Sequence, residues 1–423
     1  MRRVCAASSL IVITTFTLAV AQRLEDTDAV PLDHRAIQYT ELPANDPVAV
    51  LQKRVAKGEL KLEFQRNRWG YLPNLLKQLG VNTDSQVLVF SKTSFQAERV
   101  SPARPRAIYF NDNVSVGFVQ GGEALELASL DSKQGVVFYT LDARNSAAPE
   151  FARRDECLNC HRGAQTMGVP GRMISSLYPR GVRGSLHGVS FLTDHRTPIE
   201  ERWGGWYVTG KLGAQRHLGN AIPSPLPGGG IDPRDFQSLT SLEEKFDTSA
   251  YLTPTSDVVA LMTLEHQTRM TNLITRIGWD FRIAREDGML EASREQLDSA
   301  VDEMLTYMLF ADEAPIREPI EGVSTFTKTF PQRGPRDHRG RSLRDFDLRK
   351  RLFRYPLSYM VYSDAFDGMP EIARERIYQR LYDVLTEKDA GPRFASLSAE
   401  DRRSILDILR DTKPNLPAYW SQN

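Results

Sequence analysis

The chain has 423 residues, of which 41% are hydrophobic and 26% are charged, so it is long enough to bury one or two hydrophobic cores. This composition argues against a disordered chain. Because 54 Lys and Arg residues balance 54 Asp and Glu residues, no global charge attracts nucleic acid or an anionic membrane. We therefore expect no nucleic-acid partner, and any partner surface must be local.

Residues 1–21 have the pattern of a cleaved secretory signal peptide. Two arginines precede an uncharged apolar stretch, and Ala19-Val20-Ala21 forms a small-residue cleavage site. The apolar stretch is shorter than the ~20 residues that cross a bilayer, which disfavours an uncleaved membrane anchor. We expect an exported chain, periplasmic in a bacterium, with no transmembrane segment in its mature part. Cys5 would leave with the signal peptide, so the mature chain would keep two cysteines.

Residues 22–84 are polar and loosely patterned, which predicts an arm with short helices, one of them within residues 46–58. Residues 85–254 are predicted to be rich in β-structure. Their first part contains short β-branched or aromatic runs separated by turn residues, at 86–92, 106–112, 114–122, 124–131 and 135–142. From about residue 150 onwards, Gly and Pro are frequent, so this segment is ordered by loops or by something bound to it.

Residues 255–423 have a helical period. Asp257 offers an N-cap before a long amphipathic run, and two capping-box patterns follow, Ser293 with Gln296 and Ser398 with Asp401. The predicted fold class is therefore α+β. A β-rich N-terminal half with a loop-rich binding segment is followed by a mainly α-helical C-terminal half that packs on it.

Cys157, Cys160 and His161 form a C-x-x-C-H motif within "ECLNCHR". Two thiols at this spacing reach the two vinyl groups of a haem, and the adjacent histidine ligates the iron. A zinc site would need a second pair of ligands, and the remaining histidines form no such pair. A thioredoxin-like dithiol would begin a helix after a buried strand, and "EFARRDE" is not such a strand. We therefore predict one covalently attached haem c.

The motif resembles that of the monohaem c-type cytochromes, a likeness that covers five residues. Together with "GVPG", "ERWGGWYVTG", "RHLGN" and "LEHQTRMTNLITR", it also resembles a bacterial group of larger exported proteins that contain a cytochrome c domain. This second likeness extends from about residue 85 to the C-terminus and implies a haem, but it brings no established activity. The size of the chain and its β-rich segment before the motif differ from small cytochromes c, whose fold is not expected here.

The ligand on the second face of the iron decides between functions. Six ligands suit electron transfer, whereas an open position suits the binding of peroxide or oxygen. His217 is the first choice, because 56 residues separate it from His161 and give the chain enough length to cross the ring. His266 is the alternative; it shares a helix face with Met262 and Met270, which equally predicts a buried core stripe.

The predicted function is an exported monohaem c-type cytochrome that acts in one-electron transfer. Three alternatives stay open: a peroxidase-like haem enzyme with an open distal site, a non-catalytic haem sensor, and a structural zinc module. Whether the protein is an enzyme is therefore not decided by its sequence.

Several residues would support the cofactor. A carbonyl of Val169 or Pro170 could accept a hydrogen bond from the second ring nitrogen of His161. Trp203 lies beside two glycines, which allow the backbone to approach a flat ligand, although ordinary core packing is an equal expectation.

Cations are expected at the haem carboxylates and at a docking surface. Arg172 and Arg216 are candidates to bind the propionates. Residues 331–354 contain nine Arg or Lys residues against three Asp residues. This basic run is either a solvated face or a docking site for an acidic redox partner, whose identity the sequence does not give.

Overall fold

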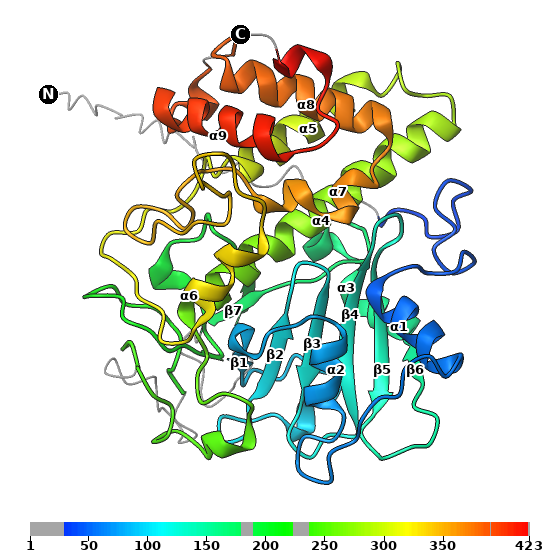
Figure 1. Cartoon of the computed structure of the whole chain (residues 1–423), viewed down its shortest axis with the longest axis vertical. Helices are drawn as coiled ribbons and strands as arrows, with labels where there is room; N and C mark the ends of the chain where they lie inside the picture. Colours follow the sequence, from blue (N-terminus) through cyan, green and yellow to red (C-terminus); the bar gives the residue numbers. More distant parts are fainter. Residues whose placement is uncertain (1–28, 179–188, 223–236, 390, 422–423) are drawn as a thin grey trace, which may run out of the picture.

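The computed structural model describes residues 29–178, 189–222, 237–389 and 391–421. The predicted signal peptide lies outside these residues. In the described part of the chain, no helix combines the length and the apolar character needed to cross a membrane. The α+β prediction is confirmed: a large antiparallel sheet occupies the N-terminal half, and the long helices lie in the C-terminal half (Figure 1).

Seven strands form the large sheet, in the order β6-β5-β4-β3-β2-β1-β9, and β7 pairs with β8 in a separate two-stranded sheet. Every pairing is antiparallel. The five runs predicted from alternation all become strands, while β6 to β8 were not predicted. The strands are β1 (Val87–Val89), β2 (Arg106–Phe110), β3 (Val114–Phe118), β4 (Ala124–Asp131), β5 (Gly135–Asp142), β6 (Phe151–Arg153), β7 (Ser175–Tyr178), β8 (Val189–Leu192) and β9 (Trp206–Tyr207).

The helices include α4, which has 29 residues and runs along the sheet. Asp257 caps α4 as predicted, accepting hydrogen bonds from two amides of the first turn. Ser398 and Asp401 form the predicted capping box of α9, whereas the side chain of Ser293 makes no capping hydrogen bond. The helices are α1 (Pro47–Ala56), α2 (Leu72–Gln78), α3 (Leu158–His161), α4 (Val258–Glu286), α5 (Arg294–Met308), α6 (Phe326–Thr329), α7 (Asp364–Asp367), α8 (Glu371–Leu385) and α9 (Ala399–Thr412).

The two faces of the sheet belong to two hydrophobic cores. α1 and α2 contribute to the core on one face, and α4 with the C-terminal helices forms the core on the other. Residues 29–84 are therefore not a free arm. Leu51 and Leu75 are buried in the first core, and the amide of Val48 reaches the Ser129 hydroxyl on β4. The predicted arm is in fact a cover for the sheet, because its apolar side chains are spaced too irregularly to reveal an amphipathic period.

Candidate functional site

The C-x-x-C-H motif begins at Cys157, the N-cap of the short helix α3, and its other residues lie on α3, shortly after the edge strand β6. A 3-10 turn over Asp155–Cys157 joins the two elements. Cys157 and Leu158 pack against the α4-side core, while the side chain of Cys160 is exposed to solvent. One thiol is therefore anchored at the sheet and the other faces outward.

One ring nitrogen of His161 is hydrogen-bonded to the backbone. Its Nδ1 lies 3.0 Å from the carbonyl oxygen of Gly171, and the Gly171 amide donates back to the His161 carbonyl at 2.9 Å. Nδ1 therefore carries the proton and donates, and Nε2 makes no hydrogen bond with any described residue. Burial lowers the pKa of His161, which keeps the ring neutral. A neutral imidazole with Nδ1 fixed by a carbonyl presents Nε2 as a metal ligand.

The carbonyl that orients His161 was predicted at Val169 or Pro170 and lies one residue further on. The Pro170 carbonyl instead accepts from the Val136 amide at 3.2 Å, which ties the loop to β5. Gly171 has no room for a side chain, because a Cβ there would lie 2.4 Å from the Asn272 amide oxygen. The loop and α4 thus fix the position of the Gly171 carbonyl.

The thiol of Cys157 is not activated. Burial, with smaller contributions from Glu156 and Glu126, raises its pKa to about 11, so it is protonated at neutral pH. Reactive and redox-active thiols need the opposite, a lowered pKa. Both Cys157 and Cys160 are free cysteines. This environment disfavours a dithiol redox site.

The structure offers no convergent zinc site at the motif. Within residues 29–178, 189–222, 237–389 and 391–421, the ligand atoms of one group, Asp337, His338 and Asp411, lie within 4.8 Å of one another, and those of the motif do not. Divergent sulfur and nitrogen atoms fit a wide planar group better than a single tetrahedral ion.

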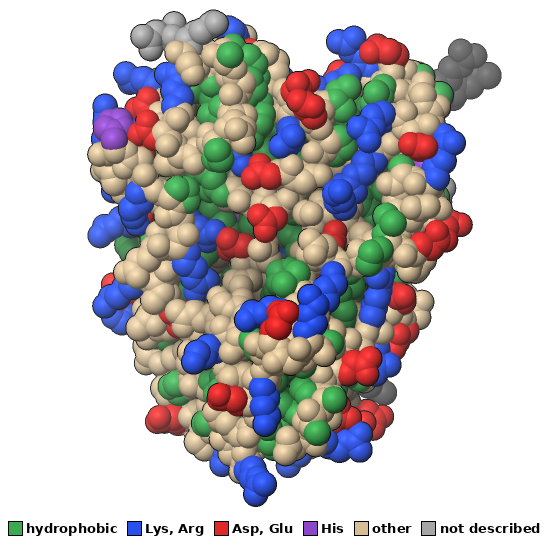
Figure 2. Space-filling view, turned by 45° about the vertical axis from the view of Figure 1, so that its right-hand side comes forward, with side chains coloured by type: hydrophobic (Ala, Val, Ile, Leu, Met, Phe, Trp, Pro, Cys, Tyr) green, Lys and Arg blue, Asp and Glu red, His purple; other side chains and the backbone are tan. Residues whose placement is uncertain are grey.

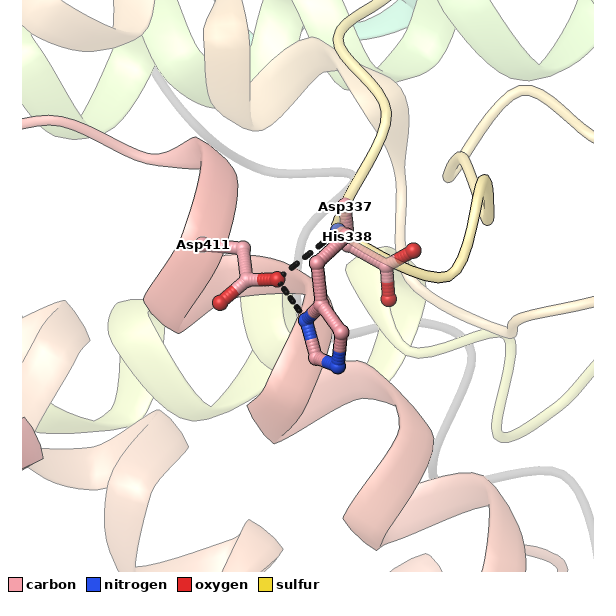
Figure 3. Close-up of side chains that lie close together, drawn as sticks. All are labelled: Asp337, His338 and Asp411. Carbon is pink, nitrogen blue, oxygen red and sulfur yellow. Dashed lines mark hydrogen bonds and ion pairs between the residues drawn. The ribbon is translucent and has the colours of Figure 1, made fainter.

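The group of Asp337, His338 and Asp411 does not have the arrangement of a metal centre. Nδ1 of His338 bonds to Asp411, and the Asp337 carboxylate points away from both (Figure 3). Arg341 already binds that carboxylate at 2.6 Å. The group is therefore a set of ion pairs that joins the basic run to α9.

His217 lies near the opposite edge of the sheet from the motif. The amides beside it bind the loop of β9, since Leu218 donates to the Arg202 carbonyl and Asn220 donates to the Trp206 carbonyl. The His161 ring contacts Phe138 of β5 at a tilt of 45°, with ring centroids 4.7 Å apart. Five strand spacings separate β5 from β9, which is about 24 Å along the sheet. The prediction that His217 is the distal ligand is not supported by this geometry.

His266 is also engaged elsewhere. Its Nδ1 lies 2.9 Å from Nδ1 of His195 and its Nε2 lies 2.7 Å from the Ser358 hydroxyl. The ring is fully buried and stacks on Tyr307, and burial lowers its pKa to about 3. Neither ring nitrogen of His266 is free to bind iron. The structure therefore favours the other expectation from the sequence, that His266 belongs to a buried stripe of the core.

Three of the predicted supporting residues lie in two different places, one between β3 and α4 and the other around His217. Arg172 is buried between β3 and α4, where it donates to the hydroxyls of Ser115 and Thr271 at 2.7 and 3.2 Å. Trp203 is fully buried and meets His217 edge-on at 5.2 Å. Arg216 is exposed in the loop before His217. These residues form no common pocket with His161, whereas Phe138, which sequence reasoning missed, does contact it.

The basic run is largely neutralised. Six of its nine cations form ion pairs with acidic side chains: Arg333, Arg336, Arg339, Arg341, Arg344 and Arg351. For Arg349, Lys350 and Arg354 no ion pair occurs with a described residue. Basic and acidic side chains are also interspersed over the face seen in Figure 2. The run is thus mainly a network that holds the C-terminal region together.

No protein-family model, curated protein or solved structure matches this chain. Its function must therefore be argued from the motif and its surroundings.

Proposed function

We propose that this chain is an exported monohaem c-type cytochrome that acts in one-electron transfer. The observation that carries the proposal is the state of His161: Nδ1 donates to the Gly171 carbonyl, which leaves Nε2 for the iron. Cys157 and Cys160 flank it at the spacing needed for two thioether bonds. When bound, the haem would supply an iron that exchanges one electron.

The thiols suit attachment without further chemistry. Each S–H adds across one vinyl double bond, so a C–S bond and a C–H bond form and no oxidant or reductant is needed. The protonated state of Cys157 and the absence of a bond between the two sulfurs agree with this requirement. The exposed position of Cys160 agrees with a cofactor that would have one side near solvent, where a redox partner could approach.

A second candidate function is supported by the positions of the other histidines. Neither His217 nor His266 faces His161, so neither of the two predicted distal ligands lies where it could bind the second face of the iron. An open position would suit a peroxidase-like haem enzyme or a haem sensor. Carbon monoxide binding by the reduced protein separates these functions from electron transfer, because a six-coordinate iron has no free site.

The deciding experiment is to express the full chain in a bacterium that matures c-type cytochromes and to measure the mass of the purified protein. We expect a mature N-terminus near Gln22, one covalent haem and a pyridine haemochrome spectrum of the c type. Cys157→Ala with Cys160→Ala should abolish attachment, while His338→Ala, a control at an exposed histidine, should not. A bare polypeptide mass, or bound zinc, in the wild type would overturn the proposal.

A further inference from the structure

The α4-side face of the large sheet is closed at one end and partly open at the other. Phe110, Leu130 and Val136 are buried beneath α4 at the closed end. Towards the other end, strand β4 alternates between fully buried side chains and the half-buried Glu126 and Ala128. β2 does the same, with Arg106 and Ile108 half-buried. This part of the face has no complete cover.

The open end lies beside the motif. Cross-strand pairing places Ala128 opposite Phe138, whose ring contacts His161. One row further along the same face, Gly117, Glu126 and Thr140 stand opposite one another. Several of these residues are small, and β2 to β5 span about 14 Å at the usual strand spacing. The face is therefore incompletely covered at the position that a flat group attached to α3 would reach.

Two guanidinium groups stand on this open face. Arg106 pairs with Glu126 at 2.8 Å and lies flat over Gly117, where a Cβ would come within 2.9 Å of it. Its Nε is buried and has no hydrogen-bond partner. Arg154 extends from the end of β6 and donates to the Thr140 hydroxyl at 2.8 Å. Arginines are well suited to bind carboxylates such as haem propionates.

A large aromatic side chain at the rim of the face lacks a packing partner. Phe95 is 67% exposed, more than any other large hydrophobic residue of the described chain. Its neighbours are fixed, because the Ser94 hydroxyl and the Gln96 amide both donate to the Glu126 carboxylate, at 2.5 and 2.9 Å. The loop is therefore held over the open face while its one aromatic ring remains in solvent. Burying a Phe side chain contributes about 2 kcal/mol, which favours a ligand that covers it.

We infer that the haem carried by Cys157 and Cys160 lies over this open end of the sheet, with Arg106 and Arg154 facing its propionates and Phe95 packing against its ring. The inference rests on the proposed function, and it replaces Arg172 and Arg216 as the carboxylate partners. It also gives a role to the ion pair of Arg106 with Glu126 on a sheet face whose closed end is a hydrophobic core.

The first test measures the haem reduction potential in charge variants. Arg106→Met removes a cation near the iron and should lower the potential, while Glu126→Gln removes an anion and should raise it. Each change should alter the equilibrium constant for reduction by about tenfold, and a tenfold change equals about 59 mV for one electron. Lys211→Met, which breaks an exposed pair with Glu321 just beyond β9 at the opposite edge of the sheet, should leave the potential unchanged.

The second test needs no substitution. Hydroxyl-radical footprinting compares the haem-loaded chain with the chain made without haem maturation. Oxidation of Phe95 should fall several-fold on loading, while Met289, which is 48% exposed and far along the chain, should be oxidised equally in both forms. Circular dichroism of both forms confirms that the comparison is between folded proteins.

The outcomes separate the two proposals. A wild type without covalent haem overturns the proposed function. The placement of the haem alone is overturned by a different result. In that case the wild type carries covalent haem, Arg106→Met and Glu126→Gln leave the reduction potential unchanged, and Phe95 is not protected from oxidation. Opposite potential shifts together with protection of Phe95 support the placement. The reduction potential of the double variant Arg106→Met with Glu126→Gln should lie near that of the wild type, because one cation and one anion are removed together. This result would show that the shifts in the single variants come from charge and not from misfolding.

Discussion

Replacing His217 by leucine should stabilise the protein at acidic pH. His217 is 1% exposed, and neither of its ring nitrogens has a hydrogen-bond partner. Burial lowers the pKa of this imidazole to about 4. In the unfolded chain a histidine titrates near 6.5. The unfolded chain therefore binds more protons than the folded one between these two values, and stability falls as the pH drops through this window.

The magnitude follows from the two pKa values. Between pH 7 and pH 5, a folded pKa of about 4 against 6.5 unfolded removes about 2 kcal/mol from the free energy of unfolding. Leucine binds no proton in either state. The free energy of unfolding of the His217→Leu variant should therefore fall by about 2 kcal/mol less than that of the wild type between pH 7 and pH 5. Leucine also removes two unpaired polar atoms from the core, so stability at pH 7 should rise by about 1 kcal/mol or more.

Urea unfolding at pH 7, 6 and 5 measures both the pH dependence of the free energy of unfolding and the gain in stability at pH 7. The His217→Gln variant separates these two effects. Glutamine cannot titrate, so it should flatten the pH dependence without the gain at pH 7. Neither substitution should alter the haem spectrum, because His217 lies about five strand spacings from His161 along the sheet. If the free energy of unfolding depends on pH in both variants as it does in the wild type, His217 is not a buried neutral imidazole. A high-spin, carbon monoxide-binding His217→Leu variant refutes its placement and restores it as the distal ligand.

Three further predictions concern other parts of the chain. Gly171→Ala should lower the melting temperature and the haem-to-protein absorbance ratio of the proposed cytochrome, because the added Cβ meets the Asn272 side chain and displaces the carbonyl that orients His161, the proposed proximal ligand. Arg202→Met should cost about 3–5 kcal/mol in urea unfolding, since it leaves the fully buried Glu265 without its cation, and adding Glu265→Leu should recover much of that loss. Reversing both cations at positions 349 and 350 should leave the rate of electron exchange between the proposed cytochrome and an acidic partner unchanged at low and at high salt in stopped-flow measurements, because the basic run is mostly neutralised by acidic side chains of the protein itself.

Local patterns in the sequence were sufficient for most of the fold. Strand β4 was predictable because buried and half-buried side chains alternate along it, and α9 because Ser398 and Asp401 form a capping box. Strand β6 was not predictable, since three residues are too few to show a period. Residues 29–84 were taken for an arm because their burial depends on contacts with the sheet, which no local pattern encodes.

The candidate site also has features that local sequence predicts and features that it does not. The motif and the carbonyl for His161 are local features, and the prediction of that carbonyl was one residue from Gly171. The distal ligand was a question of spatial position. The length of chain before His217 would allow it to cross a haem, but β9 pairs with β1, and this choice of strand order carries the residue to the far side of the sheet. The sequence around β9 gives no sign of which strand it will join.

The edges of the sheet restrict where a redox partner can bind. β9 has two residues and β6 has three, and β6 is followed at once by α3, so neither edge offers a long row of free backbone groups to another chain. Arg153 and Arg154 add charge beside β6, which further disfavours pairing. A partner must therefore approach a face or a loop. In the proposed arrangement, the attachment helix α3 closes one edge and directs the haem towards the open end of the α4-side face. Electron exchange would then take place at the rim of that face, near Cys160, and not at the basic run, whose arginines mostly bind acidic side chains of the protein itself.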